Sequence, residues 1–406
     1  MTGARCGAMR TAGWGSGVAG IVLGLHVGVG VGRSVLDDGL VLGREGVVGL
    51  GVDEQVQLRT TFPPAWVVVV LGHFVEAQLQ IVVRTHPLGS VDGAFFQGGV
   101  DFTARDVLWH AAQAFNHTTS ETADADYAAQ SLRDLLERDE SLVSVLCADD
   151  GTLGRLLRLL GASRGLAEFL LRDTQAVLLL QTPLERPLGR DEYHRIIRAS
   201  VGGADDVAAN HGDDGRDALR RAYRREVLRL ASFDLELEDP LEGLDAVAAA
   251  LADLAGAAID ASLAVARAEV IAAGQTPESL GALAFAVIGM GKCGARELNY
   301  VSDVDVIFVA QTRDEELLSA EATTALGTRI AQLTMRGIYE VSKEPGLWEV
   351  DANLRPEGKA GALVRTLDSH LAYYERWAKN WEFQALLKAR PLAGDSDLGH
   401  QYCAAV

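Results

Sequence analysis

Two short apolar runs joined by a glycine-rich stretch constrain the fold of this chain more than any other feature of its sequence. Leu283–Met290 and Val304–Val309 lack the helical period of the segments before them, and such short apolar runs are typical of buried strands. Only nine residues separate Gly294 from Val304. A βαβ unit needs a crossover of about a dozen residues or more, so this connection is too short for one.

The glycine-rich stretch matches two nucleotide-binding motifs only superficially. Gly289-x-Gly291-x-x-Gly294 satisfies the dinucleotide-binding fingerprint of a dehydrogenase, but that motif requires the crossover helix that is missing here. A Walker A loop is excluded because no Gly-Lys-Ser or Gly-Lys-Thr occurs. We expect the glycines instead to let backbone N–H groups and Ser302 approach a phosphate, with Lys292 as a nearby point charge.

A pair of carboxylates lies at the start of the second predicted strand. Asp303 and Asp305 are two residues apart, so their side chains project from one face, about 6.6 Å apart at the backbone. Two crowded, partly dehydrated carboxylates repel each other, and a divalent cation removes that penalty. We expect Mg²⁺, which binds through one or two carboxylates and completes its shell with water and substrate phosphates. A plain exposed strand at a sheet edge is the alternative.

A third predicted strand, Gly346–Leu354, repeats the spacing of the acids. Glu349 and Asp351 are again two apart and can complete a site for two metal ions beside the second strand. Two ions about 3.5–4 Å apart stabilise both the attacking and the leaving oxygen of an in-line displacement at phosphorus. For Glu349 the alternative is a surface acid without a ligand role.

Helical periodicity surrounds these strands. Residues 217–232 combine five arginines with an apolar stripe, which indicates either a packed helix with a hydrated arginine face or arginines that face a phosphate or an acidic partner. Further helices are expected over residues 240–273, 313–335 and 370–389. A sheet with flanking helices implies an α+β catalytic module.

Charge and cysteine usage exclude several classes of protein. The 406 residues carry a net charge of −19, which argues against a nucleic-acid-coating protein because such proteins need a concentrated basic face. The four cysteines include no C-x-x-C pair, so neither a disulfide framework nor a cysteine metal site is expected. A reducing cytoplasm fits this usage best. The acids of residues 201–215 do not have the spacing of a calcium loop.

The first 120 residues receive no fold assignment. They hold 20 of the 43 glycines in their first hundred positions and show neither helical nor alternating periodicity. Residues 11–32 carry no charge, but their eight glycines weaken the interpretation as a membrane anchor. We favour a misplaced start codon that adds non-native sequence, and we expect no membrane partner.

Three ordered motifs resemble one family. Residues 289–308 read Gly-Met-Gly-Lys-Cys-Gly-Ala-Arg-Glu-Leu-Asn-Tyr-Val-Ser-Asp-Val-Asp-Val-Ile-Phe, and residues 348–361 read Trp-Glu-Val-Asp-Ala-Asn-Leu-Arg-Pro-Glu-Gly-Lys-Ala-Gly. Tyr-Tyr-Glu-Arg-Trp at 373–377 and Trp-Glu-Phe-Gln-Ala-Leu-Leu-Lys-Ala-Arg-Pro at 381–391 form the third. Together they resemble the glutamine synthetase adenylyltransferase/adenylyl-removing enzymes of the polymerase-β-like nucleotidyltransferase superfamily.

The resemblance implies a domain plan and a reaction. Together with the sequence pattern, which leaves 1–120 unassigned and indicates a helical region at 121–275, it implies a nucleotidyltransferase domain at 276–368 and the start of a truncated helical domain at 369–406. The chain resembles the first of the family's two catalytic halves, which removes AMP from a tyrosine of glutamine synthetase by phosphorolysis and releases ADP. The second half adds AMP from ATP. An inactive fragment that binds or regulates glutamine synthetase is the alternative.

The resemblance also implies roles for single residues. The metal carboxylates would be Asp303, Asp305 and Asp351, with Glu349 as our own weaker addition. Contacts to phosphate or nucleotide would come from Gly291, Lys292, Gly294, Ser302, Arg355 and Lys359. Mg²⁺ would be the cofactor, and a nitrogen-signalling protein would be the regulator. Ala295 and Cys293 depart from residues frequent in the family and leave the paired aspartates untouched.

Overall fold

The computed structural model describes residues 122–406 apart from 204–205, together with six short strands in the first 102 residues. These strands form three separate antiparallel pairs: β1 (Leu42–Gly43) with β2 (Gly46–Val47), β3 (Val70–Gly72) with β4 (Gln80–Val82), and β5 (Ala94–Phe96) with β6 (Val100–Phe102). The uncharged stretch 11–32 and most of the unassigned segment 1–120 lie outside the described residues. The chain divides into two compact units, 1–183 and 184–406.

Residues 122–183 of the first unit are helical, as the helical region predicted from residue 121 implies. They contain α2 (Ala125–Arg138), α3 (Leu142–Ala148), α4 (Asp150–Ala162), α5 (Arg164–Arg172) and the 3₁₀ helix η1 (Thr174–Gln181). Asp124 caps α2 by accepting the N–H of Tyr127. The helix buries Leu132, Leu135 and Leu136 on one face, and it packs against α4 and α5.

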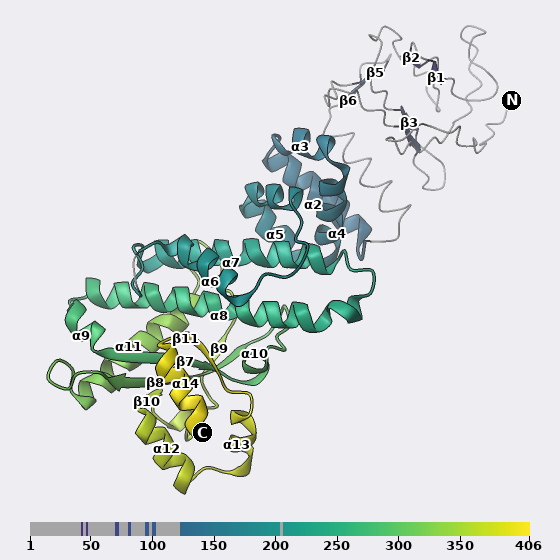
Figure 1. Ribbon diagram of the computed structural model, residues 1–406. Helices are drawn as coiled ribbons and strands as arrows, with labels where there is room; N and C mark the ends of the chain where they lie inside the picture. Colours follow the sequence, from purple (N-terminus) through teal and green to yellow (C-terminus); the bar gives the residue numbers. More distant parts are fainter. Residues whose placement is uncertain are drawn as a thin grey trace. The chain divides into compact units, whose positions relative to one another are not determined.

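Helices and a small mixed sheet share one core in the second unit (Figure 1). The chain first forms α6 (Arg190–Val201), α7 (Gly212–Asp234), α8 (Pro240–Ala272) and α9 (Pro277–Gly281). It continues through the following elements: β7 (Leu283–Gly289), α10 (Gly291–Ala295), β8 (Val304–Thr312), α11 (Ala320–Tyr339), β9 (Val350–Asp351), η2 (Gly358–Ala360), β10 (Val364–Arg365), α12 (Leu367–Arg376), α13 (Asn380–Leu386), β11 (Arg390–Gly394) and α14 (Ser396–Ala405).

The strand order β10-β8-β7-β11 defines the sheet, with β9 pairing along β8 as well. Strands β7 and β8 are antiparallel, with Gly289 opposite Val306, which confirms that the glycine-rich stretch is not part of a βαβ unit. Strands β9 and β10 both run parallel to β8. The α+β class predicted from the sequence is therefore confirmed.

Each face of the sheet has its own apolar layer. Val304, Val306 and Phe308 of β8 join a core made with α6, α7, α8 and α11. Ile307 and Val309 face the other way and pack with Tyr374 of α12 and with residues of α13 and α14. The alternation of β8 thus buries both faces, as expected for a central strand.

Helix α8 is the longest helix among the described residues and runs through the core. It begins at Pro240, after an Asp239 cap, as the sequence predicts. Of the helices in the described part of the chain, it alone is long and apolar enough to cross a membrane, but 78% of its apolar window is buried inside the protein. Burial against α6, α7 and α11 accounts for its composition.

The structure corrects several predicted boundaries. Strand β11 lies where the helical segment 369–406 was expected: helix α13 ends at Leu386, and Arg390–Gly394 pair antiparallel with β7. The predicted helix 370–389 is two helices, because Glu382 accepts the N–H of Lys379 and starts α13 anew. Helix α11 begins at 320 and not at 313, because Ser319 caps it. The division predicted at 275/276 separates elements that share one core.

Candidate functional site

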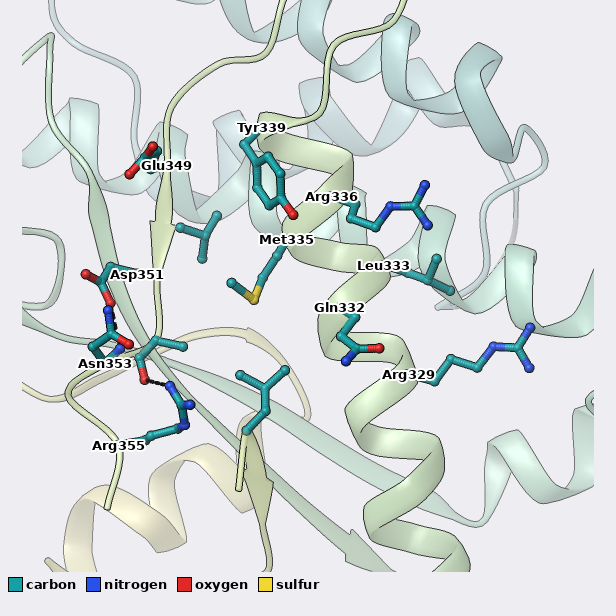
Figure 2. A pocket seen from close by; sticks show the side chains of 13 residues that line it. Arg329, Gln332, Leu333, Met335, Arg336, Tyr339, Glu349, Asp351, Asn353 and Arg355 are labelled. Carbon is teal, nitrogen blue, oxygen red and sulfur yellow. Dashed lines mark hydrogen bonds between the residues drawn. The ribbon is translucent and has the colours of Figure 1, made fainter. Parts of the chain in front are cut away.

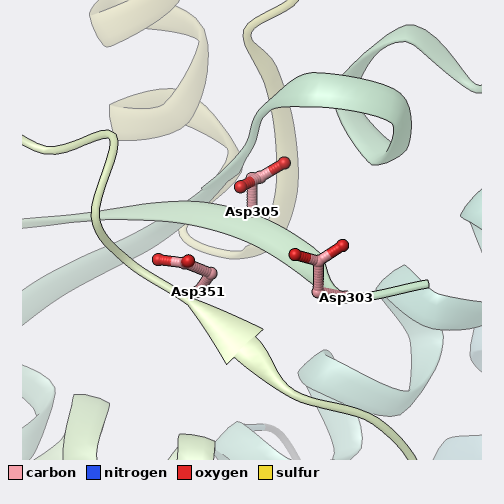
Figure 3. A group of neighbouring side chains, drawn as sticks. All are labelled: Asp303, Asp305 and Asp351. Atoms are coloured by element: carbon pink, nitrogen blue, oxygen red, sulfur yellow. The ribbon is translucent and has the colours of Figure 1, made fainter.

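Three carboxylates from two neighbouring strands meet at one end of β8 (Figure 3). The parallel register places Val304 opposite Val350 and Asp305 opposite Asp351. Asp303, Asp305 and Asp351 each offer an oxygen, and these three oxygens all lie within 4.8 Å of one another. The side chain of Asp303 is exposed, whereas Asp305 and Asp351 are half-buried. The structure thus brings together the three aspartates that were predicted to act together.

The pattern of β8 explains the direction of Asp305, which lies within the strand, whereas Asp303 directly precedes it. Val304 and Val306 enter the core beside α8 and α11. Asp305 lies between them and points to the opposite face of the sheet. This is the face on which Ile307 packs against α12 and α14. The strand therefore fixes the direction of Asp305 through burial of its neighbours on both sides.

The electrostatics of the cluster indicate an uncompensated negative charge. Burial raises the pKa of Asp305, and the charges of Asp303 and Asp351 raise it further, while Lys292 acts in the opposite direction. Three carboxylates with oxygens this close form a donor set of hard oxygen ligands, which is the kind that Mg²⁺ prefers. The residues present therefore fit a divalent cation.

The glycine-rich turn closes over this cluster. Gly291 has a φ of +52°, and a Cβ there would collide with the Asp305 carboxylate, so only glycine fits. A Cβ at Gly294 would instead collide with the carbonyl oxygens of Lys388 and Gly289. Gly291 thus lets the turn lie close to the Asp305 carboxylate, and Gly294 lets the turn pack against the backbone of Lys388 and Gly289.

Two polar side chains predicted to contact phosphate lie next to the cluster. Ser302 Oγ donates to Asp303 Oδ1 at 3.5 Å. Lys292 is exposed, and its Nζ donates to Asn299 Oδ1 at 3.1 Å. The positive charge of Lys292 lowers the pKa of Asp305 and so opposes the upward shift caused by burial.

The other predicted residues lie on the segment after β9. The guanidinium of Arg355 donates to the carbonyl oxygens of Ala352 at 2.7 Å, Gly361 at 3.2 Å and Lys359 at 3.3 Å, so it braces this turn. Lys359 is exposed on η2. The phosphate contacts of both residues stay predictions. Glu349 is outside the cluster of three aspartates, and its ligand role also stays a prediction.

A cavity of about 750 Å³ adjoins Asp351 (Figure 2). One wall is the outer face of α11, and the other is formed by β9 and the residues that follow it. Both Glu349 and Asp351 contribute to this second wall. Of the three aspartates, only Asp351 lines this cavity.

Arginines of α7 support the strand that carries Asp351, which was not foreseen. Arg220 is fully buried, and its guanidinium donates to the carbonyl oxygens of Gly337 at 2.9 Å and Glu344 at 3.0 Å. Arg224 donates to Pro345 O and Gly346 O. These arginines hold the connection 340–349 before β9, so they do not form a hydrated face. Arg224 also pairs with the carboxylate of Glu344 at 3.6 Å, which is an acidic partner within the chain. Only the unusual density of arginines pointed to them.

Comparison with known proteins agrees with this geometry. The profile of the family "Glutamate-ammonia ligase adenylyltransferase" matches residues 153–405, which is more than half of the chain. The match includes all three aspartates of the cluster.

Several curated relatives share the name "Bifunctional glutamine synthetase adenylyltransferase/adenylyl-removing enzyme". The protein from Leifsonia xyli subsp. xyli is 51% identical over 287 residues, which are 70% of this chain and 28% of the relative. Those from Cutibacterium acnes and Mycobacterium leprae are 42% and 40% identical over 71% and 76% of this chain. The chain thus spans less than a third of the length of these relatives. On the combined ground of profile and relatives, the chain belongs to the glutamine synthetase (glutamate-ammonia ligase) adenylyltransferase family.

Proposed function

We propose that this chain is a Mg²⁺-dependent nucleotidyltransferase that removes AMP from a tyrosine of glutamine synthetase by phosphorolysis. The observation that carries the proposal is the convergence of Asp303, Asp305 and Asp351 within 4.8 Å, in a chain of this family. A polymerase-β-like arrangement of the sheet is part of the proposal. In this view the chain corresponds to the adenylyl-removing half of its bifunctional relatives.

The reaction balances with phosphate as the only co-substrate. An oxygen of hydrogen phosphate forms a bond to the phosphorus of the adenylyl group, and the bond from that phosphorus to the tyrosyl oxygen breaks. The proton of hydrogen phosphate passes to the tyrosyl oxygen. ADP and unmodified tyrosine are the products, with no other oxidant, reductant or acid required.

The residues of the chain supply position and charge in this proposal. Mg²⁺ bound at the three aspartates would neutralise the charge that develops on the phosphoryl oxygens. Lys292 attracts the incoming phosphate, and Ser302 orients it beside Asp303. The cavity beside Asp351 leaves room for the tyrosine and its neighbouring residues. Arg355 and Lys359 are proposed as further phosphate contacts through the family resemblance.

The test is release of ADP from adenylylated glutamine synthetase in the presence of phosphate and Mg²⁺. Asp303→Asn should lower the rate at least about 10²–10³-fold, as removal of a contact to the developing charge does in other enzymes. Asp245→Asn is the matched control, because Asp245 is an exposed aspartate on α8 outside the cluster. Equal rates for wild type and Asp303→Asn would refute the proposal.

The second candidate is a fragment that binds or regulates glutamine synthetase without turnover. Retained binding to glutamine synthetase without Mg²⁺-dependent ADP release would favour it. For either function we propose a cytoplasmic location, where the free thiols of Cys293 and Cys403 stay reduced, and a nitrogen-signalling protein as regulator.

A further inference from the structure

A buried aspartate of α8 lies between two arginines that come from distant parts of the chain. The side chain of Asp253 is 2% exposed. Its Oδ2 accepts from Arg296 Nη2 at 2.6 Å, and its Oδ1 accepts from Arg390 Nη1 at 3.1 Å. Arg296 follows the glycine-rich turn, and Arg390 begins β11. The side chain of Arg390 is 18% exposed and that of Arg296 is 51% exposed, so Asp253 and Arg390 form the buried part of this group. Removal of Arg390 would leave the buried carboxylate of Asp253 without its more buried partner.

The guanidinium of Arg390 also binds the glycine-rich turn directly. Its Nη2 donates to the carbonyl oxygen of Cys293 at 3.0 Å, and its Nε donates to that of Gly294 at 3.2 Å. The planar fork of an arginine suits this pattern of one carboxylate and two carbonyl groups, and a lysine cannot reproduce it. Arg390 therefore ties the turn to α8 through Asp253.

The backbone at the end of the turn also depends on this group. Arg296 has a φ of +61°, a left-handed conformation that costs free energy for a residue other than glycine. Its ion pair with Asp253 holds the residue there. The Arg296 N–H donates to the carbonyl oxygen of Cys293, which is the same oxygen that Arg390 contacts.

The turn held in this way touches the aspartate cluster on its other side. The Cα of Gly291 lies so close to the Asp305 carboxylate that a Cβ would collide with it, and the Met290 N–H donates to the Asp305 carbonyl oxygen at 2.9 Å. Lys292 follows directly, and its Nζ donates to Asn299 Oδ1 at 3.1 Å. A shift of the turn would therefore move Lys292 relative to Asp305, which is held in β8.

We propose that Asp253, Arg296 and Arg390 form a clamp that positions the glycine-rich turn, and with it Lys292, against Asp305. The three are positioning residues, because they act through the turn and contact neither phosphate nor metal. The effect of the clamp on phosphorolysis rests on the proposed function, whereas its effect on the position of the glycine-rich turn does not. The clamp also explains why α8, the central helix of the core, carries a buried acid.

The experiment compares Arg390→Gln with Arg313→Gln in the full chain. Arg313 is the matched control, since it makes the same kinds of contact at the opposite end of β7: it donates to Gly281 O and Leu283 O and pairs with the Asp395 carboxylate. The first measurement is hydrogen exchange of the metal-free protein, followed at the amides of Gly294 and Glu297, which donate to Met290 O and Lys292 O.

We expect Arg390→Gln to speed exchange of these amides about tenfold or more, while exchange in β8 stays unchanged. Arg313→Gln should leave the turn unaffected. In phosphorolysis, Arg390→Gln should raise the KM for phosphate or the Mg²⁺ concentration for half-maximal rate about 10–100-fold, with a smaller change in kcat. Arg390→Lys keeps the charge without the fork and should show the same pattern, which covers the case that the glutamine variant does not fold.

Unchanged exchange of the turn in both Arg390 variants would overturn the clamp. Equal acceleration by Arg313→Gln would overturn it as well, because the effect would then be general loss of stability. If the wild-type chain forms no ADP, the proposed function fails, and the exchange comparison still decides on the clamp by itself.

Discussion

At the scale of single residues, the aspartate cluster lowers the stability of the metal-free protein, because its carboxylates repel one another. Asp303 and Asp305 could be predicted as a pair from their spacing on one strand. Their closeness to Asp351 could not be derived from spacing alone, because it depends on the parallel register of β8 and β9, which are almost fifty residues apart. Here the family resemblance supplied what local pattern cannot.

Replacement of Asp305 tests whether its charge destabilises the metal-free protein. The pKa of Asp305 is raised in the fold, so its protonated form is favoured there, and the metal-free protein loses stability as pH rises through this raised pKa. Asp305→Asn should therefore raise the Tm in EDTA at pH 7, by about 1–2 °C for each kcal/mol of stability gained in a chain of 406 residues. The gain should shrink as pH falls. A lower Tm for the variant in EDTA would contradict this account.

His370 predicts the opposite pH dependence. It is 1% exposed and stacks near Tyr374 and Tyr402, and burial lowers its pKa to about 4. A lowered histidine pKa gives stability that is present above about pH 6.5 and is lost as pH falls toward 4. The contribution of His370 to unfolding free energy should be roughly 2 kcal/mol smaller at pH 5 than at pH 7. Urea unfolding of His370→Phe should lack this part of the pH dependence, and an identical profile would argue against it.

At the scale of elements, β7, β8 and α8 could be predicted from the sequence. Elements buried on both sides have continuous apolar runs, which are visible in the sequence. Strand β11 was missed because its five residues follow two helical turns and take their conformation from pairing with β7. Strand β9 is shorter than predicted, with only Val350–Asp351 in the ladder. Its position depends on α7, whose arginines bind the connection before it, and such long-range contacts leave no periodic pattern.

Substitution of Arg220 tests the support that α7 gives to β9. Arg220→Met keeps much of the side-chain volume but removes the donors to Gly337 O, Ser342 Oγ and Glu344 O. We expect a loss of about 3–5 kcal/mol in unfolding free energy, as for other broken buried charges. Arg133→Met, which removes a surface pair with Glu137, should cost less than about 1 kcal/mol. Equal losses for the two variants in urea unfolding would contradict the role of Arg220.

At the scale of the whole molecule, the chain carries a net charge of −19, and three of its aspartates gather in one cluster whose repulsion a bound cation would relieve. The fold places the cluster at one end of a sheet whose faces are covered by separate helical layers. Composition indicated an acidic chain without a nucleic-acid face, but the place where that charge concentrates required the three-dimensional pairing of strands.

Stabilisation by Mg²⁺ tests the central claim most directly. The Tm of wild type and Asp245→Asn should rise on addition of Mg²⁺ at pH 7, because the ion binds the folded cluster and not the unfolded chain. Asp351→Asn removes one of the three ligands and should abolish most of this rise. A Mg²⁺-dependent rise of the same size in Asp351→Asn would show that the three aspartates do not form one metal site.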